Sequence, residues 1–265
     1  SEIITSDISL VAKIEVNVYS VSLTAENGEV IGFGEYEHGS RVTISVTPDE
    51  GYHFVSWSDG DMSITRNLVI TSDITLSAVI SINVYDLVVN AENGIVTNVG
   101  RYEHGSVVDI SAIPNAGYHF VSWSDGDSVA TRTITLTSNV TLSAYFELNV
   151  YELVLEAENG VVFGAGRYSH GTEVSIAAFA NEGYKFVGWS DGENTEVRKI
   201  VLISDSALMA QFAVNRHTIT LLAENGKVYG GGEYDYGTEI TIEAEAADNY
   251  HFVRWSDGNT SAKRQ

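Results

Sequence analysis

Cysteine is absent from the sequence, which excludes disulfide bonds, thiolate metal sites and a cysteine nucleophile. Basic residues are scarce: 14 Lys and Arg stand against 36 Asp and Glu, for a formal net charge of -22 at pH 7. A chain of that charge repels nucleic acid and anionic lipid, so we expect neither as a partner. No apolar run approaches the roughly 20 residues that span a bilayer, so no membrane insertion is expected. Stability must come from packing.

What the chain does contain is an internal repeat with a period of about 66 residues, and self-similarity at a fixed period indicates copies of one unit. Its four tryptophans are evenly spaced, within the words FVSWSDG, FVGWSDG and FVRWSDG, and the word AENG keeps the same spacing. The positions kept in all four copies include a glutamate, a tryptophan and an arginine: Glu26, Glu92, Glu158, Glu224, Trp57, Trp123, Trp189, Trp255, Arg66, Arg132, Arg198 and Arg264.

Within each copy, apolar and polar residues alternate, as in RTITLTS at 132–138 and VTLSAYF at 140–146. Such alternation predicts half-buried strands, and no stretch has a helical period. AENG and WSDG supply Asn-Gly and Asp-Gly pairs, which favour tight hairpin turns. We therefore predict an all-β chain. It would be a tandem array of small antiparallel β domains, with about six strands per copy, forming an extended rod.

Two further patterns concern the backbone. Gly51, Gly117 and Gly183 are replaced by Asn249 in the last copy. Because Gly and Asn both tolerate the left-handed region, we predict that the backbone has a positive φ at this position. Between copies, the apolar parity switches at Val84 to Tyr85 without a Gly, Pro or Ser linker. A switch inside an extended pattern indicates a bulge, or a strand crossing directly into the next unit. We therefore predict restricted hinges.

The third copy reads YELVLEAENGVVFGAGRYSHGTEVSIAAFANEGYKFVGWSDG. The last strand pattern of a copy has the form TL.A.F, as in TLSAYF at 141–146. These words resemble the divergent internalin B-type B-repeat of bacterial surface proteins, over essentially the whole chain. The resemblance implies a non-catalytic, mainly β extracellular module, found in tandem in adhesins and other secreted proteins. It also implies a β-grasp-like shape, although no helix is visible here, and a small sandwich is the other expectation.

We predict one partial unit and four repeats. Residues 1–18 would be the last two strands of a preceding repeat, and repeat 4 would lack its own last two strands. The repeats are 19–84 (repeat 1), 85–150 (repeat 2), 151–216 (repeat 3) and 217–265 (repeat 4).

The repeated words offer two candidate chemistries. An exposed indole face would suit a sugar ring, whereas a buried one would fill the core of a small unit. The repeated arginine could stack on the tryptophan or pair with the repeated glutamate. The acidic turns invite a calcium interpretation, since hard cations take carboxylate oxygens at tight bends, but turn chemistry alone explains them. The calcium candidates are Asp59, Asp61, Asp125, Asp127, Asp191 and Glu193.

Histidines recur at two positions of the repeat, but Tyr236 replaces the first type and Lys185 the second. A zinc site would need them in every copy, so a polar edge position is the simpler interpretation. Lysines have no period, which argues against isopeptide cross-links, and no spacing singles out an acid/base pair or a nucleophile. We therefore predict no enzyme activity, no catalytic residue, no cofactor and no metal. The histidines are His38, His104 and His170, then His53, His119 and His251.

Both ends of the sequence fall inside a copy, because residues 5–19 match 71–85 and repeat 4 stops after Arg264. The chain is an excerpt of a longer array, its folding unit runs in a shifted frame, or the first strands of one molecule complete the open last unit of another. The third interpretation predicts head-to-tail filaments.

The sequence as a whole favours a non-enzymatic repeat region of a bacterial cell-surface or secreted protein, serving as a semi-rigid stalk, spacer or adhesive segment. The alternatives are a self-assembling filament subunit and a glycan- or calcium-binding module. A protein or glycan receptor is expected for an adhesive segment, but no motif names it.

Overall fold

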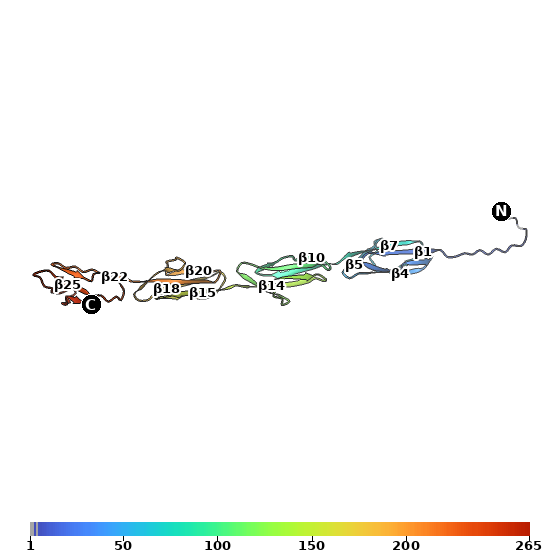
Figure 1. Cartoon of the computed structure of the whole chain (residues 1–265). Helices are drawn as coiled ribbons and strands as arrows, with labels where there is room; N and C mark the ends of the chain where they lie inside the picture. Colours follow the sequence, from blue (N-terminus) through green and yellow to red (C-terminus); the bar gives the residue numbers. More distant parts are fainter. Residues whose placement is uncertain (1–2, 4) are drawn as a thin grey trace. The chain divides into compact units, whose positions relative to one another are not determined.

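The computed structural model describes residue 3 and residues 5–265, in which every regular element is a strand and none is a helix (Figure 1). The all-β tandem array predicted from the alternation is therefore confirmed. Contacts group the chain into two compact units. One comprises the chain up to Asn115 together with Phe120–Phe146, and the other comprises Ala116–His119 together with Glu147–Gln265.

Each of the first three repeats has seven strands in two sheets. In repeat 1 the four-stranded sheet has the order β3-β1-β7-β5, and the three-stranded sheet has the order β2-β4-β6. The bounds are β1 Val18–Ala25, β2 Gly28–Ile31, β3 Gly34–Glu37, β4 Arg41–Pro48, β5 Tyr52–Trp57, β6 Thr65–Val69 and β7 Ile74–Ile82.

Repeats 2 and 3 follow the same plan, with β14 and β21 in the place of β7. Repeat 2 has β8 Val84–Ala91, β9 Gly94–Val96, β10 Gly100–Glu103, β11 Val107–Pro114, β12 Tyr118–Trp123, β13 Thr131–Thr135 and β14 Val140–Leu148. Repeat 3 has β15 Val150–Ala157, β16 Gly160–Phe163, β17 Gly166–Ser169, β18 Thr172–Ala180, β19 Tyr184–Trp189, β20 Val197–Leu202 and β21 Ser206–Val214.

The predicted small antiparallel units differ from the structure in two details: one pairing in each complete repeat is parallel, and there are seven strands where about six were predicted. The first and last strands of each repeat pair in parallel, with Val21 opposite Ile74 and Ala25 opposite Ala78 in repeat 1. The same pairing joins β8 to β14 and β15 to β21. Parallel pairing between the two ends of a repeat depends on long-range contacts, which a local alternation pattern does not contain.

The Asn-Gly turn is real but is not a hairpin. Asn27 has a positive φ of 60°, as the Asn-Gly pair predicts. However, β1 pairs with β3 and β7, whereas β2 pairs with β4, so this turn carries the chain from one sheet to the other. Gly51 has φ of +83° and its counterpart Asn249 has φ of 70°, which confirms the left-handed backbone predicted at that position.

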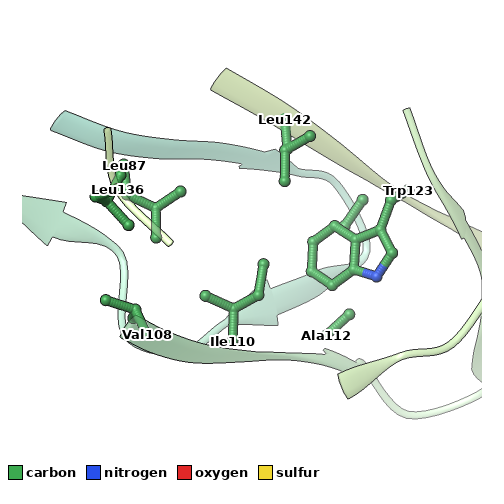
Figure 2. Close-up of a cluster of buried hydrophobic side chains, with 8 residues drawn as sticks. Leu87, Val108, Ile110, Ala112, Trp123, Leu136 and Leu142 are labelled. Carbon is green, nitrogen blue, oxygen red and sulfur yellow. The ribbon is translucent and has the colours of Figure 1, made fainter. Parts of the chain in front are cut away.

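The two sheets of a repeat enclose its core, as in a small sandwich. In repeat 2, alternate residues of β11 point inward, and Trp123 lies over them from β12 (Figure 2). Burial of apolar side chains in such an interior is the main favourable term in folding. The buried members of this cluster are Leu87, Val108, Ile110, Ala112, Trp123, Leu136, Leu142 and Ala144.

Repeat 4 is less regular because it has no counterpart of β7. The segment 220–223 and the segment 250–255, which correspond to half of β1 and to β5, are not strands, since β7 is the strand that both would pair with. The prediction that the first four strands form there is therefore wrong for the strand that carries Trp255. The strands present are β22 Arg216–Ile219, β23 Gly226–Tyr229, β24 Gly232–Asp235, β25 Ile242–Ala246 and β26 Lys263–Arg264.

The same reason applies at the amino-terminal end. Residues 5–17 contain no strand, and Leu10 and Val11 are 82% and 93% exposed. The two strands predicted within 1–18 are therefore not formed, because no strand corresponding to β1 or β5 precedes them in this chain. Residues 1, 2 and 4 of that prediction lie outside the described residues.

Candidate functional sites at the tryptophan and at the repeat junction

The tryptophans of the three complete repeats are core residues. Trp57, Trp123 and Trp189 are 0%, 1% and 1% exposed. Each ends the fifth strand of its repeat with its side chain between the two sheets, and Phe54 meets Trp57 edge-on with ring centroids 5.7 Å apart. The buried indole N–H of Trp57 donates to the carbonyl oxygen of Ser63 at 3.0 Å, so the one polar group of this side chain is paired.

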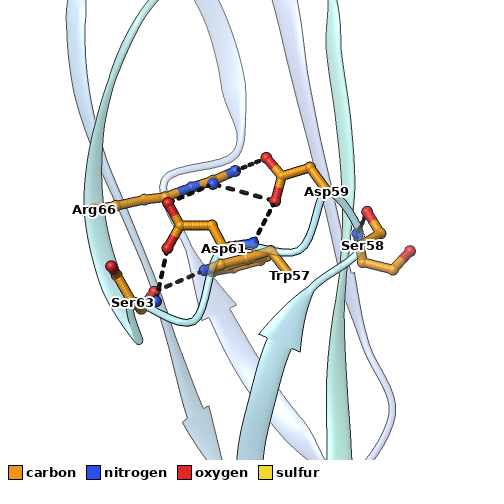
Figure 3. A network of polar contacts seen from close by, with 7 residues as sticks. Trp57, Ser58, Asp59, Asp61, Ser63 and Arg66 are labelled. Carbon is orange, nitrogen blue, oxygen red and sulfur yellow. Dashed lines mark hydrogen bonds and ion pairs between the residues drawn. The ribbon is translucent and has the colours of Figure 1, made fainter.

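The repeated arginine stacks on this indole and pairs with the acidic turn. The guanidinium carbon of Arg66 lies 5.8 Å from the centroid of the Trp57 ring. Its Nη2 donates to Asp59 Oδ2 at 2.6 Å, and its Nη1 lies 3.0 Å from Asp61 Oδ2 (Figure 3). The arginine side chain is only 13% exposed, which strengthens both contacts relative to open water. We call this group the tryptophan clasp.

The clasp is present in every repeat. Arg132 pairs with Asp125 at 2.7 Å, Arg198 with Asp191, and Arg264 with Asp257 at 2.5 Å. The distances from the guanidinium carbon to the indole centroid are 6.0, 5.8 and 6.0 Å. Of the two partners predicted for the arginine, the tryptophan is therefore the one observed. The repeated glutamates are exposed, and no ion pair of theirs occurs within the described chain: Glu26, Glu92, Glu158 and Glu224.

Five of the six calcium candidates, the aspartates, belong to the clasp; for the sixth, Glu193, it is the backbone N–H that donates, to Asp191 Oδ1 at 3.3 Å. Asp59 Oδ1 accepts the N–H of Asp61 at 3.2 Å, and Asp61 Oδ1 accepts the N–H of Ser63 at 2.7 Å, while the other oxygens face Arg66. In the part of the chain that the structure describes, no three His, Asp or Glu side chains are grouped to hold a metal. The aspartate carboxylates are positioned to hold the turn and the arginine. The buried indoles of repeats 1 to 3 likewise present no open face to a sugar.

The arginine lowers the pKa of the clasp aspartates. Its hydrogen bond is the main cause for Asp59, Asp125, Asp191 and Asp257, whereas for Asp61 the backbone N–H of Ser63 is the larger cause. A pKa that is lower in the folded chain stabilises the fold at every pH above the ordinary aspartate value of about 4. That stabilisation disappears as the pH falls through the lowered folded value.

We therefore expect acid to weaken the clasp. Asp125→Asn should lower the melting temperature by a few degrees at pH 7, where the pair with Arg132 is charged, and the difference from the parent should shrink as the pH falls below about 4. Thermal unfolding between pH 7 and pH 2 measures this. Glu92→Gln, which removes an exposed carboxylate from the same repeat, is the matched control. An Asp125→Asn penalty that stays constant down to pH 2 would contradict the assignment.

The second candidate site is the junction between repeats. β7 ends at Ile82 and β8 begins at Val84, so one residue, Asn83, separates them. The N–H of Asn83 donates to the carbonyl oxygen of Gly51 in repeat 1 at 2.7 Å, and its own carbonyl oxygen accepts the N–H of His104 in repeat 2 at 2.8 Å. The Nδ1 of His53 donates to Asn83 Oδ1 at 2.8 Å. A single residue is thus bonded to both repeats.

The His104 side chain packs directly on a glycine of the preceding repeat. A Cβ placed on Gly51 would lie 2.2 Å from His104 Cδ2, so only hydrogen fits there. On repeat 2 itself, the ring meets Tyr85 with centroids 5.9 Å apart. The interpretation of His104 as a polar edge residue is therefore wrong, because its ring contacts the preceding repeat. The sequence of a single repeat does not reveal a contact with its neighbour.

The junctions after repeats 2 and 3 use the same contacts. Asn149 donates to Gly117 and accepts from His170, both at 2.8 Å. At the third junction Tyr236 takes the place of the histidine. Its ring covers Gly183, where a Cβ would be 2.2 Å from Tyr236 Cδ1, and its hydroxyl donates to Glu182 at 2.7 Å. Glu182 raises the pKa of this tyrosine.

The junction asparagine was missed by the sequence analysis, although a signal was present. Asn17, Asn83, Asn149 and Asn215 recur with the same period as the tryptophans. Asn is a poor strand residue, so its retention inside an extended apolar pattern could have marked it as a connector. The aspartate that pairs with the arginine was noticed as a turn residue and as a metal candidate, but not as the partner of the arginine.

Four consecutive segments match the family described as "Divergent InlB B-repeat domain", at residues 19–83, 85–150, 151–216 and 217–265. Two relatives come from Evansella cellulosilytica. One, named "Putative membrane protein", is 28% identical over 94% of this chain and 40% of its own length. The other, named "Putative Gly-rich membrane protein", is 26% identical over 95% of this chain and 31% of its own length. The chain thus spans less than half of either relative.

Among solved structures, "The Bacillus anthracis TIE protein" aligns with 91% of this chain and 71% of its own, at 11% identity and a TM-score of 0.32. Across the described residues there is no helix with the length and apolarity of a membrane span.

Proposed function

Because the chain belongs to the divergent InlB B-repeat family, we propose that it acts as a non-enzymatic, semi-rigid stalk or spacer in a bacterial surface protein. The family and the relatives named as membrane proteins support a repeat-containing surface protein. The proposal adds a cell-surface or secreted location and the mechanical role. The net charge of -22 suits that role, because neighbouring stalks would repel one another.

The observation that carries the proposal is the one-residue junction. Asn83 has both backbone groups bonded, one to each repeat, and the His104 ring occupies the space over Gly51. A Gly- or Ser-rich linker would instead let neighbouring repeats turn independently. In repeat proteins, contacts between neighbours add to the intrinsic stability of each unit. A chain of such junctions would resist bending and hold a terminal domain away from a surface.

An adhesive contribution would have to use the exposed strands and variable loops, such as residues 95–99, rather than the clasp. The indoles of repeats 1 to 3 are buried and their turn aspartates are engaged by arginine, which favours the stalk over the glycan and calcium alternatives at the repeated words. Enzymatic chemistry finds no support in the clasp either, since each of its charged groups is used to hold a turn.

Small-angle X-ray scattering of the chain tests the stalk proposal. Strands of up to 9 residues give a repeat about 30 Å long, so an extended array would reach roughly 110 Å, with a radius of gyration of about 30 Å. A compact protein of 265 residues would give about 18 Å, and an unfolded chain about 57 Å. A radius of gyration at the compact value would overturn the proposal.

A further inference from the structure

The first and last strands of each complete repeat form a parallel ladder inside a sheet. In repeat 2 the order β10-β8-β14-β12 makes β8 and β14 the two inner strands. Their register runs over five pairs, from Leu87 opposite Val140 to Ala91 opposite Ala144. The pairs β1–β7 and β15–β21 have the same five-pair register. The strands that form the ladder are thus the two through which the chain enters and leaves the repeat.

Parallel pairing decides how tension along the chain loads the ladder. The chain enters β8 at Val84, at the end of the ladder where Leu87 lies, and leaves β14 at Leu148, at the opposite end. Tension therefore pulls the two strands past each other along their own axes, and the bonds between them must yield together. If the two strands were antiparallel, the chain would enter and leave at one end of the ladder, and tension would open its bonds one at a time.

A side-chain hydrogen bond extends the ladder at its entry end. Asn139 comes directly before β14, and its Oδ1 accepts the backbone N–H of Asp86 at 2.9 Å. The corresponding side chains, Asp73 in repeat 1 and Asp205 in repeat 3, each accept the equivalent backbone N–H at 2.8 Å. Asn and Asp both supply this oxygen, so the three complete repeats keep the added bond although the residue type changes.

Packing shields the ladder from water. Leu87 of β8 and Leu142 of β14 are buried in the core cluster of repeat 2, and Val89 and Val140 pack against the same cluster. In the plane of the sheet, β10 and β12 flank the ladder on its two sides. Water competes for backbone hydrogen bonds, so a ladder covered in this way loses its bonds less readily when it is stretched.

We propose that the parallel ladder makes each complete repeat a tension-resisting unit, so that the chain serves as a tether under load as well as a spacer. One residue, Asn83, separates β7 from β8, and another, Asn149, separates β14 from β15. Tension therefore reaches the ladder of repeat 2 with almost no slack chain to draw out first. This inference deepens the proposed stalk function and rests on it, because a stalk that joins a cell to a bound surface carries load.

Single-molecule force spectroscopy of the full chain in two pulling directions tests the proposal. Because the chain has no cysteine, two introduced thiols are its only attachment points. Val84→Cys with Glu147→Cys places the anchors at opposite ends of the ladder and shears it. Val84→Cys with Thr137→Cys places both anchors at the entry end and peels it open. All three positions are exposed, so neither pair of substitutions alters the core.

We expect the shearing pair to hold to a severalfold higher force than the peeling pair at equal loading rate, since forced unfolding reports the barrier along the direction of pull. Rupture of the sheared repeat should lengthen the chain by roughly 180 Å, the extended length of the intervening residues less the length of the folded repeat. Equal rupture forces in the two directions would overturn the proposal, and so would a stronger peeling pair.

This test and the test of the stalk function can fail separately. Scattering measures the length of the chain at rest, so equal rupture forces would leave the stalk function standing. A compact radius of gyration would overturn the stalk function but would leave the difference between the two pulling directions unchanged, because that difference arises within one repeat.

Discussion

Replacing Trp123 by alanine should unfold repeat 2 while repeats 1 and 3 stay folded. Removing a buried Trp costs about 3–5 kcal/mol, and the single core of a domain this small supplies about as much. Repeats 1 and 3 have core clusters of their own, so they do not depend on Trp123 for burial. Hydrogen exchange read by mass spectrometry should show amides 85–150 losing protection while most others in repeats 1 and 3 keep it.

Tyr145→Ala is the matched control for this prediction. Tyr145 is an aromatic residue of the same repeat, on β14, but it is 52% exposed and faces away from the core. Its loss should leave repeat 2 protected. Equal effects of the two substitutions would contradict the assignment of the tryptophan as the core anchor, and so would unfolding of all three complete repeats together.

Replacing Gly51 by alanine should weaken the first junction by more than the backbone strain alone explains. At φ of +83° a side chain costs about 1–2 kcal/mol, and the new Cβ would also displace the His104 ring. Gly60→Ala isolates the first cost, because Gly60 has φ of +89° and no atom within 4 Å of its would-be Cβ. We expect Gly51→Ala to lower the free energy of unfolding by about 1–3 kcal/mol more than Gly60→Ala does.

A double substitution separates the two costs. In a His104→Ala background the ring is gone, so Gly51→Ala should then cost about the same as Gly60→Ala. Urea unfolding of the parent, of Gly51→Ala, of His104→Ala and of the double variant gives the coupling energy between Gly51 and His104. An excess cost that persists without the histidine would mean that the glycine is needed for a reason other than the junction.

The alternation of residues predicted that the complete repeats consist of strands, but not how those strands pair. Val42, Ile44 and Val46 are buried on one face of β4, as period two requires, and the positive φ of Asn27 follows from the AENG turn. Two features were not predicted: the parallel pairing of β1 with β7, and the passage of that turn between sheets. Both depend on contacts between residues far apart in the sequence, about which local periodicity carries no information.

At the candidate sites too, contacts within one repeat could be predicted from the sequence, whereas contacts between repeats could not. The stacking of Arg66 on Trp57 was among the predicted uses of the arginine, because the two residues keep a fixed spacing across one turn. The contact of His104 with Gly51 was not predicted, since the two residues belong to different repeats. The substitution of Tyr236 at the histidine position looked like tolerance within one copy, whereas the rings of His104, His170 and Tyr236 each cover a glycine of the preceding repeat.

The central claim is that the junction holds neighbouring repeats in one orientation. Because the chain has no cysteine, spin labels can be placed at Glu35→Cys and Arg101→Cys, on corresponding exposed strands of repeats 1 and 2. Double electron–electron resonance should give a single narrow distance distribution, and Gly51→Ala should broaden it. A distribution that is already broad in the parent chain would show independent repeats joined by a hinge, and would contradict the account.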